Sequence, residues 1–177
     1  MDEKYYFQTD CSKLLDKIIW THKIQCCELE RQKKMQFAFH IIRTVFYCVS
    51  STGVITGLLI SEKWISIISA IVIFVTALLD NIIKFLSFNE KIPQLKVNSQ
   101  QLFNLRNELA FNMRKFERGG IDDRQIESTY KDILSSFEAI CLVKIDESKS
   151  SVNEATKKLK ERHDETTNYD IVEEVLK

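Results

Sequence analysis

The sequence predicts an all-α membrane protein in which two apolar helices form a hairpin. Three observations lead to this fold class. Two segments without a charged residue follow each other closely, at residues 44–60 and 64–79. Only Ser61, Glu62 and Lys63 separate them. The chain of 177 residues contains one Pro and four Gly, and so few helix breakers over long stretches favour helices.

Each apolar segment approaches the length that a helix needs to cross a bilayer, which is about 20 residues. Extending the segments to residues 37–60 and 64–86 reaches this length and adds only the charges of Arg43, Asp80 and Lys84. The alternative is a buried hairpin in a soluble protein. A chain this short has too little remaining mass to cover two helices that are apolar on all faces. We therefore predict two transmembrane spans in a lipid bilayer.

Basic residues near the spans predict their orientation. Because the connection is so short, the spans are antiparallel neighbours and both flanks lie on one side. Lys and Arg accumulate on the cytoplasmic side of membrane proteins. The tip carries only Lys63, whereas the basic residues of the flanks are Arg31, Lys33, Lys34, Arg43, Lys84, Lys91 and Lys96. This pattern predicts two spans in the inner (plasma) membrane with both termini in the cytoplasm.

Two charged residues of the spans are predicted to pair. Arg43 lies 19 residues before Glu62 and Asp80 lies 18 residues after it, so in two helices they reach nearly the same depth. A charge in hydrocarbon is costly unless it is paired or hydrated. We predict that Arg43 and Asp80 face each other, within one hairpin or between neighbours. The alternative is that each side chain extends separately to the headgroups.

Small and polar side chains recur along one face of each span. Their spacing of three and four residues in the second span places them on one helix face. Gly53 and Gly57 permit close approach between helices. Two interpretations stay open: the spans pack on each other through these faces, or the faces form an oligomer interface or line a pore. The candidate residues are Tyr47, Ser50, Gly53, Gly57, Ser66, Ser69 and Thr76.

The polar flanks are predicted to form cytoplasmic helices. Residues 1–36 form a helix that continues into the hairpin at 37–88, residues 89–165 form a helical hairpin, and residues 166–177 form a tail. Pro93 offers either a kink or a fresh helix start.

The cytoplasmic hairpin shows heptad spacing of apolar residues, typical of packed or oligomeric helices. Gly119 and Gly120 are predicted to end its first helix, and Asp122 or Asp123 to cap a second over about 122–163. We expect residues 146–170 to form a solvated helix or to be partly disordered. The N-terminal helix is a possible third member of the bundle. The predicted core, within the bundle or between copies, is Leu95, Leu102, Leu105, Leu109, Phe116, Ile126, Tyr130, Ile133 and Phe137.

The sequence shows no arrangement of residues for catalysis. No phosphate loop, dinucleotide turn, zinc-protease helix or serine elbow is present. Lys+Arg and Asp+Glu both number 25, so net charge does not favour nucleic-acid binding. The five Cys are spaced unlike a disulfide framework, and His22 with Cys26 and Cys27 lacks a second ligand pair for zinc. We expect no enzyme activity, cofactor or metal.

Several motifs along residues 10–165 resemble the SLATT family. These are two-transmembrane effector domains associated with nucleotide-second-messenger cyclases and nucleotide sensors in prokaryotic defence. The motifs are Trp20-Thr-His-Lys-Ile, the compact hairpin 45–85 with its Ser-Glu-Lys tip, Phe85-Leu-Ser-Phe88-Asn-Glu-Lys-Ile, Leu102-x-x-Leu105-Arg106-x-Glu108 and Gly119-Gly-Ile-Asp122.

The resemblance implies a membrane effector that forms an oligomeric pore or ion channel, disrupts the inner membrane and halts growth, as in abortive infection. Two spans cannot enclose a water path alone, so a pore needs a homo-oligomer. The resemblance also implies a functional partner encoded nearby: a nucleotide cyclase, a nucleotide sensor or a reverse transcriptase. The alternative is a membrane-anchored helical scaffold that forms no pore and docks a partner protein.

Overall fold

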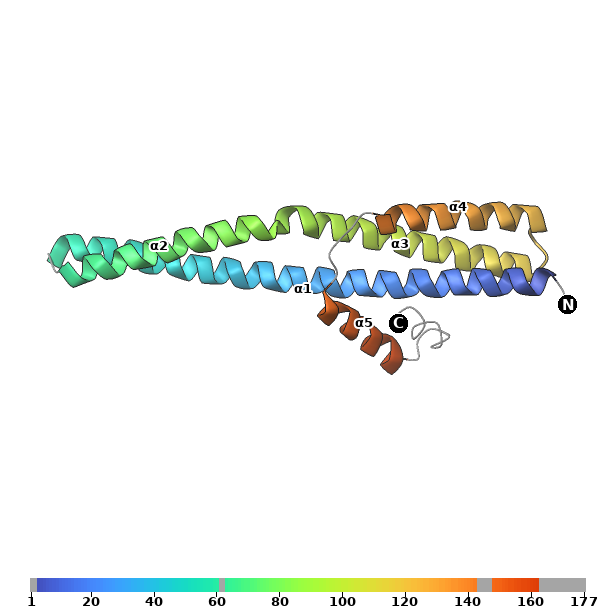
Figure 1. Cartoon of the computed structure of the whole chain (residues 1–177), viewed down its shortest axis with the longest axis horizontal. Coiled ribbons are helices and arrows are strands. Elements are labelled where there is room, and N and C mark those ends of the chain that lie inside the picture. The colour runs from blue at the N-terminus through green and yellow to red at the C-terminus, as the bar shows by residue number, and fades with distance from the viewer. Residues whose placement is uncertain (1–2, 61–62, 143–147, 163–177) are drawn as a thin grey trace. The chain divides into compact units, whose positions relative to one another are not determined.

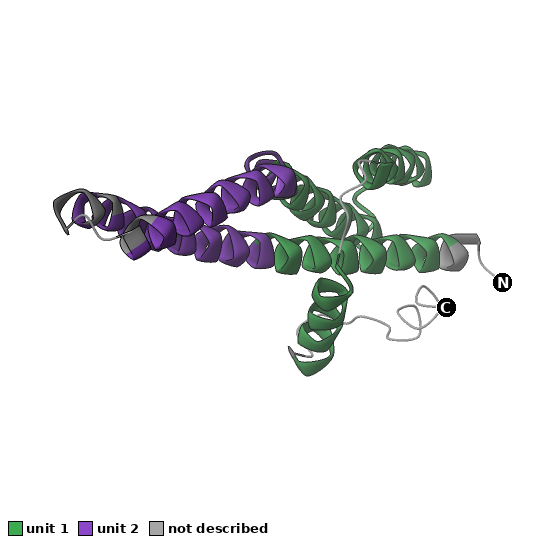
Figure 2. Ribbon diagram, turned by 60° about the vertical axis from the view of Figure 1, so that its left-hand side comes forward, with its two compact units in different colours: residues 1–29, 94–177 green, residues 30–93 purple. Residues whose placement is uncertain are grey.

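The protein is all-α, as the sequence predicts. The computed structural model describes residues 3–60, 63–142 and 148–162, which form helices and short turns without a strand (Figure 1). The five helices are α1 (Glu3–Ile60), α2 (Lys63–Leu86), α3 (Phe88–Glu117), α4 (Asp123–Leu142) and α5 (Lys149–Arg162). The chain divides into two compact units, residues 30–93 and residues 1–29 with 94–177 (Figure 2). Each unit is described by itself below.

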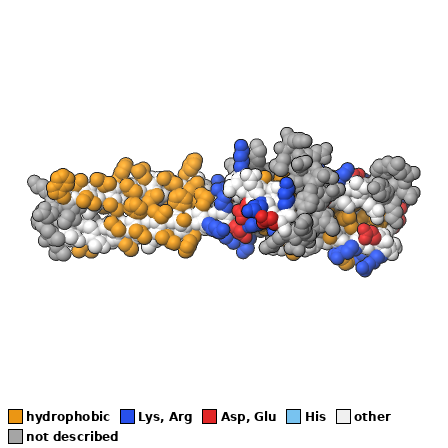
Figure 3. All heavy atoms as spheres, turned by 90° about the horizontal axis from the view of Figure 1, so that it is seen from below, with side chains coloured by type: hydrophobic (Ala, Val, Ile, Leu, Met, Phe, Trp, Pro, Cys, Tyr) orange, Lys and Arg blue, Asp and Glu red, His pale blue; other side chains and the backbone are white. Residues whose placement is uncertain are grey.

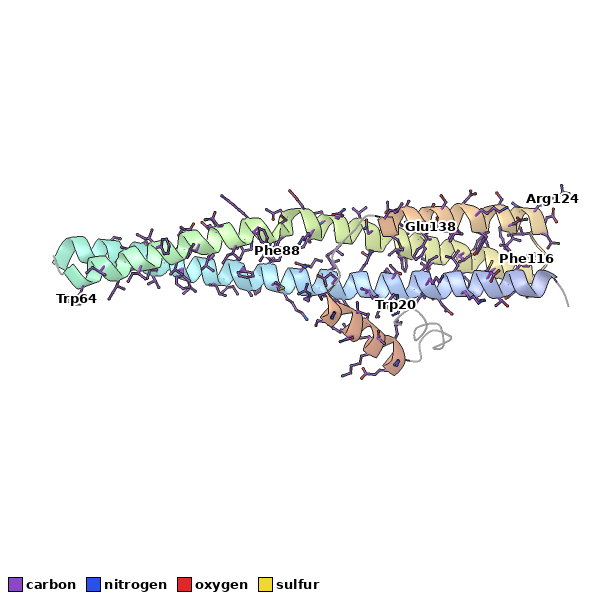
Figure 4. All side chains as sticks on the ribbon, viewed as in Figure 1. Trp20, Trp64, Phe88, Phe116, Arg124 and Glu138 are labelled. Carbon is purple, nitrogen blue, oxygen red and sulfur yellow. The ribbon has the colours of Figure 1, made fainter. Side chains whose placement is uncertain are left out.

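The unit of residues 30–93 is an antiparallel pair made by the second half of α1 and by α2. Arg43 on α1 contacts Asp80 on α2, whereas Gly53 lies against Ser69. As the residue number rises along α1, the number of the contacted residue on α2 falls, so the two helices are antiparallel. At the other end of the pair, the ring of Phe39 lies 6.0 Å from that of Phe88, which is only 2% exposed (Figure 4).

A single residue separates α2 from α3. Ser87 has a φ of 50°, in the left-handed region, and its carbonyl accepts hydrogen bonds from the backbone N–H groups of Glu90 and Lys91, both at 3.0 Å. The new helix thus starts at Phe88, and Pro93 lies inside it. The alternative that Pro93 starts the helix is therefore wrong, because the break at Ser87 comes first.

The other unit contains a bundle of three helices. Its core joins α1, α3 and α4 through the buried residues Leu14, Ile18, Leu102, Leu109, Ile133 and Ile140. The N-terminal helix is therefore the third member of the bundle. The remaining core candidates are also enclosed by this one chain. Leu95, Phe116 and Ile126 are buried, and Leu105, Tyr130 and Phe137 pack partly buried against the core.

The turn between α3 and α4 follows from its two glycines. Gly119 has a φ of 72°. Its N–H donates to the Phe116 carbonyl at 3.0 Å, and the N–H of Gly120 donates to the Lys115 carbonyl at 2.9 Å. These two bonds are the Schellman motif, which ends a helix by satisfying its last carbonyls. The predicted helix end is confirmed, and α4 starts at Asp123.

The predicted single helix over 122–163 is wrong, because α4 ends at Leu142 and α5 starts at Lys149. Nor is α5 a fully solvated helix. Its Ala155 is completely buried and packs with Ile24 and Cys27 of α1. The connection at 143–147 and the predicted tail at 166–177 lie outside the described residues.

A buried carboxylate anchors the start of α5. Glu28 on α1 is completely buried. Its Oε2 accepts hydrogen bonds from the Ser148 N–H at 3.3 Å, the Ser148 hydroxyl at 3.0 Å and the Ser151 hydroxyl at 2.6 Å. The Ser148 hydroxyl also accepts a bond from the Ser151 N–H, so Ser148 is the N-cap of α5. The partial positive charge of a helix N-terminus favours the nearby carboxylate.

Candidate functional site

The candidate site lies between α1 and α2, where the predicted charge pair meets. Arg43 Nε lies 2.8 Å from Asp80 Oδ1. The second oxygen of the same carboxylate, Oδ2, accepts a hydrogen bond from the Tyr47 hydroxyl at 2.7 Å. The guanidinium carbon of Arg43 lies 5.3 Å from the centre of the Tyr47 ring, within the range of a cation–π contact. The three side chains form one polar cluster, which we call the Arg43 cluster.

The Arg43 cluster is only partly shielded. The side chains of Arg43 and Asp80 are 37% and 28% exposed. Asp80 Oδ1 has no aligned hydrogen-bond donor among the described residues, despite the short distance from Arg43 Nε. The contact to Oδ1 is therefore an ion pair, and the directed hydrogen bond to the carboxylate comes from Tyr47. Sequence spacing predicted that Arg43 and Asp80 face each other, but not that Tyr47 holds the second carboxylate oxygen.

The small residues of the stripe bring the two helices close together. A Cβ atom added to Gly53 would lie 2.6 Å from Ser69 Oγ. Only a residue without a side chain fits beside Ser69 in its present position, because contacts below 3.0 Å require something to move. Gly57 lies in α1 and Ser66 lies in α2, but the surroundings of these two residues are outside what the structure describes.

The hydroxyl groups of the stripe are enclosed between the two helices. Ser50, Ser69 and Thr76 are 8%, 7% and 4% exposed. The Ser50 hydroxyl donates to the Phe46 carbonyl and that of Thr76 donates to the Val72 carbonyl, both at 2.8 Å. Bonds to the helix's own backbone satisfy these donors without a partner from another chain. In this single chain, the stripe is a packing face between α1 and α2.

The outer surface of the same helix pair is apolar. Figure 3 shows hydrophobic side chains gathered over α2 and the adjoining part of α1, on the face that it presents. Trp64, near the tip, is 74% exposed (Figure 4). The other exposed large apolar residues here are Phe37, Ile41, Ile42, Val45, Tyr47, Val49, Ile55, Ile67, Ile68, Ile71, Ile73, Phe74, Leu78, Ile82 and Phe85. Contact of such a continuous apolar surface with water is unfavourable, whereas its contact with lipid is favourable.

Among the described residues, one segment, Ile67–Glu117, which comprises most of α2 and all of α3, contains a window that is apolar and long enough to cross a membrane. Only 11% of that window is buried. The core helix of a soluble protein would be mostly buried, so the exposure of this window favours contact with lipid.

The described residues contain no group of three or more metal-ligating side chains. His22 Nε2 and Cys26 Sγ lie 3.4 Å apart as neighbours on one turn of α1. Cys27 is buried and packs in the contact between α1 and α5.

Comparison with known proteins gives one result. The sequence model of a family described as SMODS and SLOG-associating 2TM effector domain family 4 matches residues 7–170, nearly the whole chain. No curated protein and no solved structure match the chain.

Proposed function

This chain belongs to the SMODS and SLOG-associating 2TM effector domain family 4, the SLATT family that its motifs resemble, and from this premise we propose a pore-forming function. The family consists of membrane effectors of defence systems. In our proposal, several copies assemble into a pore or channel that disrupts the inner membrane and halts growth of the infected cell.

One observation carries the proposal: a row of charged and hydroxyl side chains runs along the contact between the two helices, whereas large apolar side chains dominate the exposed surface of the hairpin. The Arg43 cluster, Ser50, Ser69 and Thr76 form this row. Two spans cannot enclose a water path, so conduction requires several hairpins. If the helices of each hairpin rotate so that their polar faces point toward the central axis of the assembly, these faces would line the water path.

The orientation in the membrane is part of the proposal. Basic residues flank the hairpin on the side of both termini, and Lys63 stands alone at the tip. This distribution supports an inner-membrane protein with two spans and cytoplasmic termini. The functional partner would then act from the cytoplasm. We propose that a nucleotide cyclase, a nucleotide sensor or a reverse transcriptase encoded nearby supplies the trigger.

A second candidate function is a membrane-anchored scaffold that forms no pore. The observation that favours it is the packing of the stripe within one chain, because Ser50 and Thr76 bond to their own helices and need no neighbour. In this function the hairpin only holds the helical bundle at the membrane, where the bundle docks a partner protein.

The first experiment measures membrane potential and growth after induced expression of the full chain in bacteria, with and without its neighbouring genes and infection. Pore formation predicts a loss of potential, read with a voltage-sensitive dye, that precedes growth arrest. Normal potential during a defence response that protects the population would reject the pore. Replacing the hairpin with two unrelated spans separates the candidates, because only a scaffold would stay active.

A matched pair of variants tests whether the stripe lines the path. Thr76→Val and Thr52→Val each replace a hydroxyl by a methyl group, and both hydroxyls donate to the carbonyl four residues earlier, at 2.8 and 2.9 Å. Thr76 is buried in the stripe and Thr52 is exposed. We expect Thr76→Val to reduce ion flux from liposomes several-fold and Thr52→Val to leave it unchanged. Equal effects would contradict the lining role.

A further inference from the structure

We propose that the basic end of the hairpin binds anionic phospholipids of the cytoplasmic leaflet through their headgroups. The basic end is defined by five residues of the unit 30–93, which are Arg31, Lys33, Lys34, Lys84 and Lys91. The inference deepens the proposed function, because it names the class of lipid that the effector contacts. It rests on that function only in placing the hairpin in a membrane with its termini in the cytoplasm.

Positive charge exceeds negative charge at the basic end. In the two sequence segments that form it, residues 30–40 and 84–93, the five basic residues stand against two acidic ones, Glu30 and Glu90. The opposite end of the hairpin differs, because Lys63 at the tip follows directly after Glu62. An excess of positive charge therefore marks one end of the hairpin and not the other.

The lysines of the basic end are available to a partner. Lys33, Lys34 and Lys84 are exposed, and Lys91 is half-exposed. None of their ammonium groups lies within 4.0 Å of a carboxylate in the described part of the chain. Their charges are thus not neutralised by an ion pair there.

A contact between α1 and α3 places two of these lysines at the same level. Gln36 Nε2 donates to Asn89 Oδ1 at 3.4 Å. Lys34 precedes Gln36 by two residues, and Lys91 follows Asn89 by two residues. Because the two segments are antiparallel, both lysines lie about 3 Å beyond the contact, on the side away from the tip.

This level corresponds to the headgroup layer of a bilayer. The apolar surface of the hairpin ends at Phe37, which is 67% exposed and starts the first predicted span. Lys34 lies three residues earlier, about 4.5 Å along the helix. The polar layer on each side of the hydrocarbon is about 5–8 Å thick. The ammonium groups of Lys34 and Lys91 are therefore at the depth of the lipid phosphates.

A phospholipid fits this end better than a soluble anion does. Phe85 is 86% exposed and directly follows Lys84, so apolar and cationic side chains adjoin on the chain. On the face that Figure 3 presents, Lys and Arg side chains, with some Asp and Glu, gather where the hydrophobic surface ends. A soluble anion would contact only the charges, whereas a phospholipid also covers the aromatic rings with its acyl chains. Clusters of four to eight Lys or Arg beside a transmembrane helix attract anionic lipids.

Electron paramagnetic resonance of spin-labelled lipids tests the inference. The full chain is reconstituted in phosphatidylcholine vesicles with a trace of labelled phosphatidylglycerol or of labelled phosphatidylcholine with the same acyl chains. The immobilised fraction of each label gives its association with the protein. We expect phosphatidylglycerol to associate at least three-fold more strongly in about 0.1 M salt, and the preference to vanish in about 1 M salt, where screening is nearly complete. Equal association in low salt would overturn the proposal.

Two triple variants with the same change of charge locate the preference. The test variant changes the three lysines nearest the contact between Gln36 and Asn89 to Gln: Lys33, Lys34 and Lys91. The control changes three exposed lysines outside the unit 30–93, which have no carboxylate partner among the described residues, to Gln: Lys17, Lys149 and Lys160. The test variant should lose at least half of the preference and the control should retain it, with helix content checked by circular dichroism. Equal losses, or an unchanged preference in the folded test variant, would show that the basic end is not the binding surface.

Glycerol 1-phosphate separates a lipid surface from a site for free phosphate. It carries the phosphate group of phosphatidylglycerol without acyl chains. At millimolar concentration and constant ionic strength, it should leave the lipid preference unchanged. Displacement of the labelled phosphatidylglycerol would identify a phosphate site and overturn the commitment to lipid.

Ion flux from the same vesicles separates this inference from the pore proposal. A preference for phosphatidylglycerol without flux would leave the lipid surface standing and reject the pore. Flux without any lipid preference would support the pore and reject the lipid surface.

Discussion

Arg43 and Asp80 form a contact that lies between a surface ion pair and a buried one. Exposed pairs contribute about 0–1 kcal/mol to stability, whereas breaking a buried pair costs about 3–5 kcal/mol. Their side chains are 37% and 28% exposed, and the Tyr47 hydroxyl bonds to the carboxylate as well. If the hairpin lies in a bilayer, the atoms that are exposed in the isolated chain contact lipid tails or headgroups. An unpaired charge costs more free energy in that environment than in water.

Charge reversal tests this contact. We expect Arg43→Asp or Asp80→Arg alone to lower the free energy of unfolding of the hairpin by about 1–3 kcal/mol, since each leaves two like charges together. The double swap should recover part of the loss. Unfolding is followed by circular dichroism as detergent-solubilised protein is titrated with SDS.

Lys84 supplies the control, because it is an exposed charge on α2, one turn beyond Asp80. Lys84→Asp should have little effect on unfolding. If the double swap is as damaging as the two single changes combined, the two residues do not stabilise the hairpin through their contact.

At the scale of the helices, the turn between α3 and α4 depends on one backbone conformation. Gly119 has a φ of 72°, which side-chain-bearing residues rarely adopt. Gly120 has no such constraint, and a Cβ there would lie 3.5 Å from the Lys115 carbonyl oxygen, an ordinary contact. The two neighbouring glycines are therefore predicted to differ in their tolerance of alanine.

Gly119→Ala should destabilise the bundle by about 1–2 kcal/mol, the cost of the left-handed conformation for a residue with a Cβ. Gly120→Ala should cost clearly less. Thermal unfolding of both variants in the same detergent, followed by circular dichroism, measures the difference. A larger loss for Gly120→Ala would show that the Schellman turn does not set the end of α3.

The attachment of α5 depends on Glu28. Its carboxylate satisfies the Ser148 and Ser151 hydroxyls and one N–H at the start of the helix. Ala155 and Val152 of α5 pack with Ile24, Cys27 and Trp20 of α1. The buried hydrogen bonds of Glu28 add a directed attachment at the start of α5.

Glu28→Gln should weaken the docking of α5 by about 1–3 kcal/mol, because a neutral amide accepts the bonds less strongly and adds unsatisfied donors. Hydrogen–deuterium exchange should show faster exchange in residues 149–162, with the three-helix bundle unchanged. Glu161→Gln is the control, since Glu161 is exposed and pairs with Lys157 along α5. Unchanged exchange in Glu28→Gln would contradict an anchoring role.

For the whole molecule, the cysteines report whether the exposed apolar helices are in lipid. Cys48 and Cys141 are both exposed in the isolated chain, but Cys48 lies in the first predicted span and Cys141 near the end of α4. Cys11 is a buried reference. Its burial, and to a lesser degree the charge of Asp10, raises the pKa of its thiol to about 11. Its reactive thiolate is therefore scarce at neutral pH.

In inverted membrane vesicles, a membrane-impermeant maleimide should label Cys141 and spare both Cys48 and Cys11. After unfolding in SDS, all three should react. Peptide mass spectrometry locates the label without changing any residue. Labelling of Cys48 at the rate of Cys141 in intact vesicles would show that this part of α1 is in water and would reject the membrane hairpin.

The sequence alone determined the features that depend on local pattern. The helical character follows from the scarcity of Gly and Pro, and the end of α3 follows from Gly119. Nearly equal spacing from the tip predicted Arg43 opposite Asp80, because helical rise converts residue number into distance. The heptad pattern identified the buried residues of the bundle, though it left open whether they meet within one chain or between copies.

The tertiary structure decided the features that depend on distant residues. The pattern could not divide residues 122–163 into two helices, because α5 is fixed by Glu28, which precedes Ser148 by 120 residues. No local periodicity encodes a hydrogen bond over that separation. In the same way, only the packed bundle encloses the heptad leucines within one chain, since burial is a property of the assembled helices.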